Sequence, residues 1–350
     1  MSGYGARVVA ALVLALLGAR STPAAAGIDA RRCGLLQPSP QSYAWPVKPF
    51  HRPHPVRGNF GDPRTIFWGL QADDAFGGSF NFHSGVDISA AARAPVYAVA
   101  SGVVRQVAWD EIIVRARGRA FQYWHLSPAV YAGEQVRAEV TVLGTIRARS
   151  GHVHLTEIDN GQAVNPLRHL RPFSESDAPV IRGIEIRVAR TDERRLAGRS
   201  LVLRGRIWLI ADAFDYPNLA PPPRWGDLPV TPALLEWGLT GSGGRAAIPL
   251  HVAVDFRHRL PPPRLFWRTY AEGTYQNDPV IGSTHARVPG RYLFDLTPDG
   301  LNTRRLPNGQ YMLTVLASNI CGNATNLTEQ VRIENQSAAR PHPGRYGGSE

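Results

Sequence analysis

The chain has 350 residues, 43% of them hydrophobic, with 34 glycines and 29 prolines. This length exceeds one typical domain, and the composition favours a turn-rich, strand-rich globular protein of two folded units plus tails. The formal net charge is +11, almost all of it from arginine because Lys48 is the one lysine. A basic surface suits an anionic polymer, but no basic helix or aromatic RNA-binding motif supports nucleic acid as the partner.

Residues 1–26 have the features of a secretory signal peptide. Arg7 supplies a positive charge before a short apolar run, Val8–Leu17, and small residues end the segment at Ala26, where we expect cleavage. The apolar run is too short to span a bilayer comfortably, and no other segment approaches the length of a transmembrane helix. We therefore expect an exported chain without stable membrane insertion.

The segment from Gly27 to about Pro63 is rich in proline, arginine and glycine and is expected to be extended. Its two histidines, His51 and His54, lie among prolines, so we interpret them as solvated loop residues. Cys33 lies in the same segment. Its counterpart Cys321 is near the other end, and in an exported protein such a pair favours a disulfide, with two unpaired thiols as the alternative.

Two short motifs suggest a split metal site. HSGVD places His83 and Asp87 four residues apart in a β-branched and aromatic context, and HVH places His152 and His154 two residues apart. Even separations on a strand share a face, so both members of each pair could point the same way. Two histidines and one carboxylate would leave a fourth tetrahedral position for water, as in a catalytic zinc site.

Residues 95–170 alternate in the manner of short strands bounded by Gly, Pro, Asn or Asp. The runs are PVYAVASGVVRQVAW, EIIVRARG, AFQYWHLS, VTVLGTIRA and HVHLTEID. Only residues 127–138 suggest a helical or loop connection. We predict an antiparallel, strand-dominated domain with its site in a groove on the sheet.

The order of these motifs resembles the lysostaphin/LytM-type zinc endopeptidases of bacterial cell walls over about residues 45–170. The shared pieces are HSGVDIS, the APVYAVASGVV strand, YWHLS, HVHL and VNPL. The resemblance implies a Zn2+ ion held by His83, Asp87 and His154. It also implies that His125 and His152 act on the attacking water and the developing oxyanion, with peptidoglycan as the substrate.

The sequence also departs from the pattern of that family. The stretch from Gly144 to His152 and the segment after Val107 are shorter than usual, and these loops normally form the walls of the substrate groove. The last motif reads HVHLTE rather than HLHFE, which shifts Glu157 by one place. Two functions therefore remain open, a zinc endopeptidase that hydrolyses peptide bonds in peptidoglycan and a non-catalytic wall-binding or regulatory protein with the same fold.

Beyond a predicted linker at about residues 172–177, further strand-like runs indicate a second domain. Leu250, Val252, Val254 and Phe256 share one face, as do Tyr311, Leu313, Val315 and Ala317, which is the period of a half-buried strand. The runs are IRGIEIRVAR, SLVLRGRIWLIADAFD, AAIPLHVAVDF, RLFWRTY, RYLFDLT, GQYMLTVLASN and TEQVRIEN.

About seven strands fit an immunoglobulin-like or fibronectin-like β-sandwich, with loops at the proline runs 221–223 and 261–263. His251, His258 and His285 lack ligand spacing and are read as bystanders. The predicted organisation is a signal peptide at 1–26, a peptidase domain at 27–172, a sandwich at 173–336 and a disordered tail at 337–350, in an all-β protein.

Overall fold

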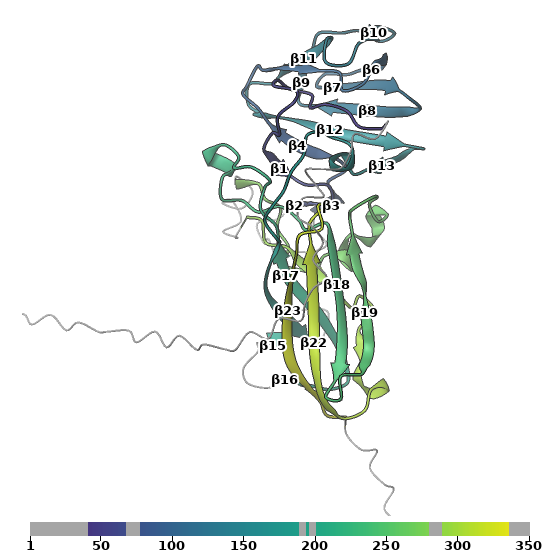
Figure 1. Ribbon diagram of the computed structural model, residues 1–350, viewed down its shortest axis with the longest axis vertical. Helices are drawn as coiled ribbons and strands as arrows, with labels where there is room; N and C mark the ends of the chain where they lie inside the picture. The colour runs from purple at the N-terminus through teal and green to yellow at the C-terminus, as the bar shows by residue number, and fades with distance from the viewer. Residues whose placement is uncertain (1–40, 68–77, 189–193, 196–200, 280–288, 336–350) are drawn as a thin grey trace, which may run out of the picture.

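The computed structural model describes residues 41–67, 78–188, 194–195, 201–279 and 289–335. Its strands form two groups at opposite ends of an elongated molecule (Figure 1). The predicted signal peptide 1–26, Cys33, His285 and the predicted tail 337–350 lie outside the described residues. The pairing of Cys33 with Cys321 therefore stays a prediction.

The N-terminal half contains an eight-stranded sheet in the order β1-β4-β12-β8-β7-β6-β10, with β13 paired to β12. Neighbouring strands pair antiparallel, as predicted. The strands of this sheet are β1 (Val56–Gly58), β4 (Val86–Ser89), β12 (His152–Asp159), β8 (Arg119–Trp124), β7 (Glu111–Ala116), β6 (Gly102–Val107), β10 (Gln135–Val136) and β13 (Gln162–Val164).

A three-stranded antiparallel sheet completes this half. It contains β5 (Pro95–Tyr97), β11 (Val142–Ile146) and β9 (Leu126–Pro128), and the 3-10 turn η1 (Pro166–Arg168) follows β13. Alternation of side chains places Val153 and Leu155 of β12 in the core, where both are fully buried. The opposite face of β12 is therefore free to carry polar side chains.

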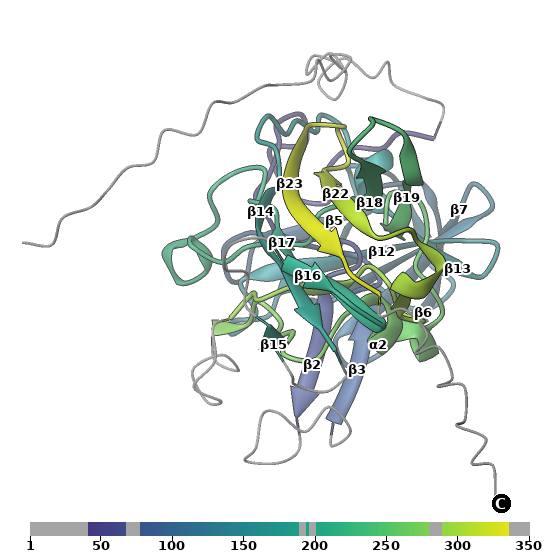
Figure 2. The ribbon, with the colours of Figure 1, turned by 90° about the horizontal axis from the view of Figure 1, so that it is seen from below.

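The C-terminal half contains two five-stranded sheets, β15-β14-β17-β20 with β21 on β17, and β16-β23-β22-β18-β19. In Figure 2, β23, β22, β18 and β19 follow one another across the molecule. The strands are β14 (Val180–Arg187), β15 (Arg194–Arg195), β16 (Leu201–Leu203), β17 (Arg206–Phe214), β18 (Leu234–Gly241), β19 (Ala246–Asp255), β20 (Leu293–Asp295), β21 (Leu301–Asn302), β22 (Gly309–Ser318) and β23 (Ala324–Ile333).

The all-β prediction is confirmed for the described part of the chain, where strands dominate and the α-helix α2 spans only Phe266–Thr269. Pairing in the C-terminal half is antiparallel except between β16 and β23, which run parallel. The immunoglobulin-like or fibronectin-like assignment and the domain limits at 172 and 336 stay predictions. No helix in the described ranges is long and apolar enough to cross a membrane.

The strand face predicted in β22 is confirmed, since Tyr311, Leu313, Val315 and Ala317 are all buried. The face predicted in β19 is only half covered. Val254 and Phe256 are buried, but Leu250 and Val252 are each 48% exposed. Leu250 and Val252 stay partly exposed because β19 is an edge strand of its sheet and has a neighbouring strand on one side only.

The run Arg264–Tyr270, predicted as a strand, is helical instead. It forms the 3-10 turn η3 (Pro263–Leu265) and then α2. The preceding prolines explain this difference, because their fixed φ suits the first turn of a helix and removes the N–H that a strand would donate.

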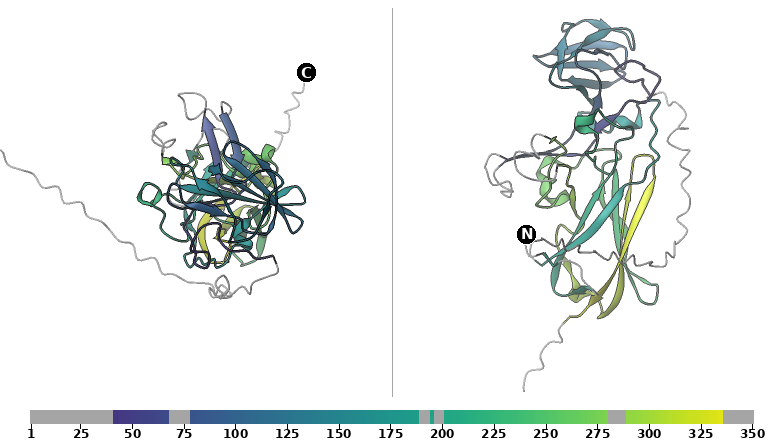
Figure 3. Two further views of the ribbon diagram at one scale, coloured as in Figure 1. Left: turned by 90° about the horizontal axis from the view of Figure 1, so that it is seen from above. Right: turned by 90° about the vertical axis from the view of Figure 1, so that its left-hand side faces the viewer.

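The hairpin of β2 (Pro63–Phe67) and β3 (Gly78–Phe82) lies between the two halves, and the side view in Figure 3 shows them stacked end to end. The ring of Phe80 stacks on Phe266 at 5.9 Å between centroids, and Phe82 packs against Phe256 and Tyr270. N-terminal residues therefore form part of the packing of the C-terminal half.

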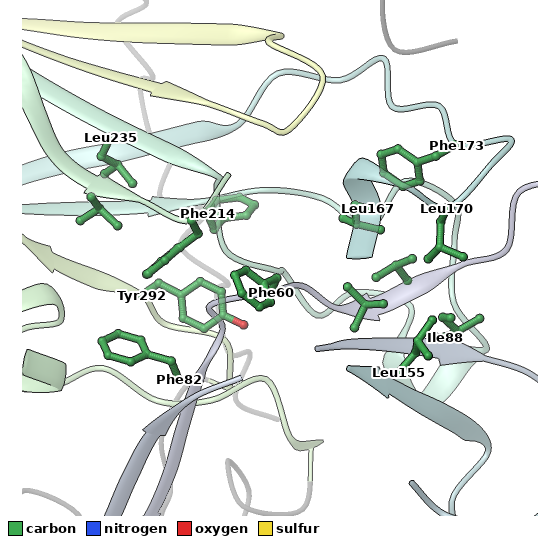
Figure 4. Close-up of a cluster of buried hydrophobic side chains, with 14 of the residues drawn as sticks. Phe60, Phe82, Ile88, Leu155, Leu167, Leu170, Phe173, Phe214, Leu235 and Tyr292 are labelled. Atoms are coloured by element: carbon green, nitrogen blue, oxygen red, sulfur yellow. The ribbon is translucent and has the colours of Figure 1, made fainter. Parts of the chain in front are cut away.

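Buried apolar side chains of both halves belong to one continuous cluster. Figure 4 shows Phe60 near Tyr292 and Phe214 on one side, with Leu167, Leu170 and Phe173 on the other. Phe173 is 2% exposed although it lies in the predicted linker. That segment is also held by side-chain donors of Asn319 and Asn323. The linker is thus packed in place between the halves.

Candidate metal centre

The candidate ligands are positioned by two adjacent strands of the eight-stranded sheet. In the antiparallel register of β4 and β12, Asp87 is directly opposite His154. Such cross-strand partners place their side chains on the same face of the sheet. His83 reaches this face from the turn before β4, and the spacing of two predicted for His152 and His154 puts both on it.

Two glycines allow the close approach of these segments. A Cβ at Gly85, within the HSGVD motif, would lie 2.2 Å from the carbonyl oxygen of Leu155 and 2.9 Å from His154 Nε2. A Cβ at Gly58 would lie 2.6 Å from Asp87 Oδ2. Any side chain at either position would displace a ligand or its strand, so only glycine fits both positions.

Three potential ligand atoms converge on one point. His83 Nε2 lies 2.8 Å from His154 Nδ1 and 3.1 Å from Asp87 Oδ1, and His154 Nδ1 lies 3.1 Å from the same oxygen. For ligands at about 2.0–2.1 Å from Zn2+, tetrahedral geometry requires separations of roughly 3.3 Å. The two nitrogens and one oxygen therefore fit a zinc ion with a fourth position open.

The second atoms of these side chains have partners that orient the rings. His83 Nδ1 donates to the carbonyl oxygen of Asn59 at 2.8 Å, which leaves the lone pair of Nε2 for a metal. His154 Nε2 lies 2.8 Å from Thr156 Oγ1, so an Nε2–H donor leaves Nδ1 free. Asp87 Oδ2 accepts from Arg64 at 2.9 Å. Such outer contacts are typical of metal sites.

The protonation states also suit a cation. Burial, with Arg64 adding to it, lowers the pKa of His83 to about 4. Burial opposes ionisation of Asp87, but His83, His152 and the hydrogen bonds from the histidines outweigh it and hold the pKa well below the ordinary value. Neutral imidazoles and an ionised carboxylate are the forms that bind metal.

His152 and His125 lie next to this cluster. His152 is 8% exposed, and its Nε2 is 3.5 Å from Asp87 Oδ1. The His125 ring is 4.5 Å from the His152 ring, and the side chain is 37% exposed. His125 has a positive φ of 69°, a rare conformation for a residue other than glycine that is found preferentially at functional sites.

The structure thus brings together all five residues predicted from the sequence: His83, Asp87, His125, His152 and His154. Four of them line an open cleft of about 350 Å³, and His152, which is not a lining residue, lies next to His125 and Asp87. The other lining residues are Arg64, Phe82, Ser84, Gln122 and Trp124. Among the described residues, only His83, Asp87 and His154 form a group of three with metal-ligand spacing.

The shifted glutamate does not belong to this site. Glu157 lies three residues after His154 and therefore points to the opposite face of β12, where it is fully buried. It accepts from Tyr43 at 2.7 Å and His169 at 2.8 Å, and it pairs with Arg119. Thr156 has the position on the metal-binding face instead.

Sequence reasoning missed the outer residues Arg57, Asn59, Arg64 and Thr156. Arg57 and Asn59 lie in the proline-rich segment that we read only as extended, and Arg64 directly follows it. Thr156 could have been found from its even spacing to His154 on one strand. The histidines read as loop residues or bystanders, His51, His54, His251 and His258, all lie outside the metal-binding group of the described residues.

Residues 81–166 match the family described as Peptidase family M23, and this range contains all five candidate residues. An uncharacterised metalloprotease of Haemophilus influenzae is 35% identical over 105 residues. That match covers 27% of this chain and 22% of the relative, so the chain spans less than a quarter of that protein. The metallopeptidase resemblance is therefore confirmed for the segment that carries the site.

Solved structures give more distant likenesses. A zinc-containing peptidase from Vibrio cholerae is 20% identical, with a TM-score of 0.29, over 36% of this chain and 39% of that chain. The catalytic domain of the antimicrobial peptidase lysostaphin from Staphylococcus simulans is 22% identical, with a TM-score of 0.25, over 31% of this chain and 86% of that chain.

Proposed function

We propose that this protein is an exported zinc metalloendopeptidase that hydrolyses peptide bonds in bacterial peptidoglycan. The observation that carries the proposal is the convergence of His83, Asp87 and His154, with His125 and His152 beside them. The match of residues 81–166 to Peptidase family M23 supports it. The formal charge of +11, or 11 − 2 = +9 after loss of Arg7 and Arg20 with the predicted signal peptide, suits an anionic wall polymer as the substrate.

We assign the metal to His83, Asp87 and His154, and the convergence of their donor atoms supports this assignment. A zinc ion held there would polarise the scissile carbonyl and lower the pKa of water to about 7. His125, which lines the cleft and is 37% exposed, and His152, whose Nε2 is 3.5 Å from Asp87 Oδ1, lie next to the ligands. One of these two accepts the proton of the attacking water and the other donates a hydrogen bond to the developing oxyanion, as in general acid–base catalysis.

The test combines metal analysis with peptide release from purified sacculi. His83→Ala, Asp87→Ala and His154→Ala should lose both zinc and hydrolysis. His125→Ala and His152→Ala should keep most of the zinc but lose hydrolysis, by about 10²- to 10⁴-fold for the general base. His51→Ala is the matched control, because its side chain is 79% exposed in a loop and should behave as wild type.

Two results would overturn this assignment. If His125→Ala kept full activity, the role of His125 in proton transfer or oxyanion binding would be wrong. If His152→Ala lost zinc as completely as His154→Ala, His152 would be a metal ligand and its assigned role would be wrong. If the wild-type protein bound zinc and sacculi but released no peptides, the non-catalytic wall-binding alternative would replace the enzyme.

A further inference from the structure

An aromatic side chain of the C-terminal half lies directly beside the candidate site. The guanidinium carbon of Arg57 is 3.8 Å from the centre of the Trp225 ring, and Arg57 is only 7% exposed. A desolvated guanidinium over an indole face is a favourable cation–π contact. The structure thus connects the second half of the chain to the edge of the metal-binding sheet.

The proline run at 221–223 fixes the position of this tryptophan. Trp225 ends the 3-10 turn η2 (Pro223–Trp225), and its backbone N–H donates to the carbonyl oxygen of Pro222 at 2.8 Å. Proline restricts φ to the range that such a turn needs. The run that the sequence suggests only as a loop therefore presents an aromatic ring to Arg57.

Arg57 in turn contacts His152. Its Nη2 donates to the carbonyl oxygen of Ser150 at 3.0 Å and lies within hydrogen-bonding distance of His152 Nδ1. A guanidinium has donors and no acceptor. Nδ1 also lies 2.8 Å from the carbonyl oxygen of Ser150, to which a protonated Nδ1 could donate. That oxygen already accepts from Arg57, and a protonated Nδ1 would face the guanidinium donor to donor. The contact with Arg57 and the Asp87 carboxylate facing the other ring nitrogen therefore favour the imidazole proton on Nε2.

Other C-terminal residues fix the backbone on which Arg57 lies. The side-chain amide of Asn277 donates to the carbonyl oxygen of Arg57 at 2.8 Å, and the N–H of Val56 donates to Asn218 Oδ1 at 3.0 Å. Both partners are more than 160 residues away in the sequence. The C-terminal half therefore holds Arg57 by its main chain as well as by its guanidinium.

We propose that Trp225 is a positioning residue of the peptidase site. By stacking on Arg57 it holds the His152 ring in one orientation with the proton on Nε2. His152 is then the hydrogen-bond donor to the oxyanion, and His125 is the proton acceptor. The catalytic part of this proposal rests on the proposed peptidase function. In this proposal the C-terminal half contributes a side chain, Trp225, that helps to orient a residue of the site in the N-terminal half.

The kinetic test uses full-length, zinc-loaded protein. Trp225→Ala should keep its zinc and its fold but lose about 10- to 100-fold in kcat with little change in KM, the range typical of outer residues that orient a functional group. Trp225→Phe retains an aromatic face and should recover most of the activity. Arg182→Ala removes a guanidinium 4.2 Å from the Phe214 ring, far along the sequence from the site, and should match wild type.

A second readout does not depend on activity. Nitrogen-15 NMR of histidine-labelled protein, with His152 assigned from a His152→Gln variant, reports which ring nitrogen carries the proton. Wild type and Trp225→Phe should show His152 protonated on Nε2 alone, and Trp225→Ala should show a mixture of the two tautomers. An unchanged His152 signal and unchanged kcat in Trp225→Ala would overturn the proposal, as would equal impairment of the Ala and Phe variants.

The two readouts separate this proposal from the proposed function. If wild type hydrolysed no peptidoglycan, the peptidase function would fail. The NMR comparison would still show whether Trp225 holds His152 through Arg57, since the tautomer signal needs no turnover.

Discussion

The two halves of the molecule bury carboxylate groups in different surroundings. In the N-terminal half, Asp87 lies beside two histidines and Arg64, and Glu157 is bonded to Tyr43, His169 and Arg119. In the C-terminal half, Asp215 is 1% exposed, and its Oδ2 lacks a hydrogen-bond partner among the described residues. Its buried neighbour, Glu175, is another acid.

The partners of a buried carboxyl group decide whether it is ionised or neutral. Partners with positive charge or N–H groups keep a buried carboxylate ionised, so it can hold a cation or an arginine. Asp215 accepts a hydrogen bond from the N–H of Tyr216, but burial outweighs it and raises the pKa of Asp215 to about 8. Burial and the neighbouring Asp215 raise the pKa of Glu175 well above its ordinary value. The ionised Asp87 of the N-terminal half therefore contrasts with the neutral Asp215 and Glu175 of the C-terminal half, although burial also raises the pKa of Asp62, in the N-terminal half, to about 7.

The largest effect is expected where a charged network is broken. Glu157→Ala should lower the free energy of unfolding by about 3–5 kcal/mol, because Arg119 and His169 would remain without their buried partner. Zinc binding should persist in the folded protein, since Glu157 points away from the ligands. Chemical denaturation and metal analysis of the same samples test both statements.

The control for this variant is Asp159→Ala, on the same strand. Asp159 is only half-buried, and its removal should change stability by no more than about 0.5 kcal/mol. If Glu157→Ala contained as little zinc as Asp87→Ala, the prediction would be wrong. Metal binding on one face of β12 would then depend on the buried network on its other face.

The second-largest effect is the pH dependence of stability that Asp215 contributes. Its direction is opposite to that of a carboxylate whose pKa is lowered by folding. The pKa of Asp215 is about 8 in the folded state and about 3.9 in the unfolded state. Folding therefore favours the protonated form, and the stabilisation is fully present below pH 4 and is lost as the pH rises through 8. Between these limits, Asp215 contributes a slope of up to about 1.4 kcal/mol per pH unit.

Asp215→Asn removes this titration and keeps an oxygen for the N–H of Tyr216. Its stability should fall less steeply than that of wild type between pH 5 and pH 8, as measured by urea denaturation. The control Asp227→Asn changes an exposed aspartate and should follow the wild-type curve. Parallel curves for Asp215→Asn and wild type would refute the neutral-acid interpretation.

The sequence predicts most of the metal-binding face, because short spacings on strands decide which side chains share a face. His152 and His154 illustrate this, and the odd spacing of Glu157 from His154 predicts its opposite orientation equally well. His125 is different, because its place depends on a positive φ at the end of β8 that only its motif resemblance indicated.

Contacts between distant segments were beyond sequence reasoning. Arg57 meets Trp225 only because the two halves pack against each other, and spacing within one strand says nothing about such a contact. The partly exposed face of β19 and the helical turn at α2 show the same limit. The exposure of β19 depends on its edge position in the sheet, and the helical turn at α2 depends on the proline run before it.

The smallest effect concerns an uncharged partner on the metal-binding face. Thr156 is 2% exposed, and its hydroxyl is 2.8 Å from His154 Nε2. Thr156→Val keeps the shape but removes the hydroxyl, so the ring of His154 is no longer fixed and a buried N–H loses its acceptor. Zinc affinity should fall about 10- to 100-fold, the range for outer partners of metal-bound histidines.

Thr156→Ser is the matched control, because it restores the hydroxyl at the same position and should recover most of the affinity. Competition with a chromogenic chelator at constant pH measures both variants, and thermal unfolding shows whether each is folded. Wild-type affinity in Thr156→Val would mean that packing alone orients His154. In that case the contacts that orient His154 would be those to the other two ligands, His83 and Asp87. The charge of the Asp87 carboxylate, and not an uncharged outer partner such as Thr156, would then fix the position of the His154 ring.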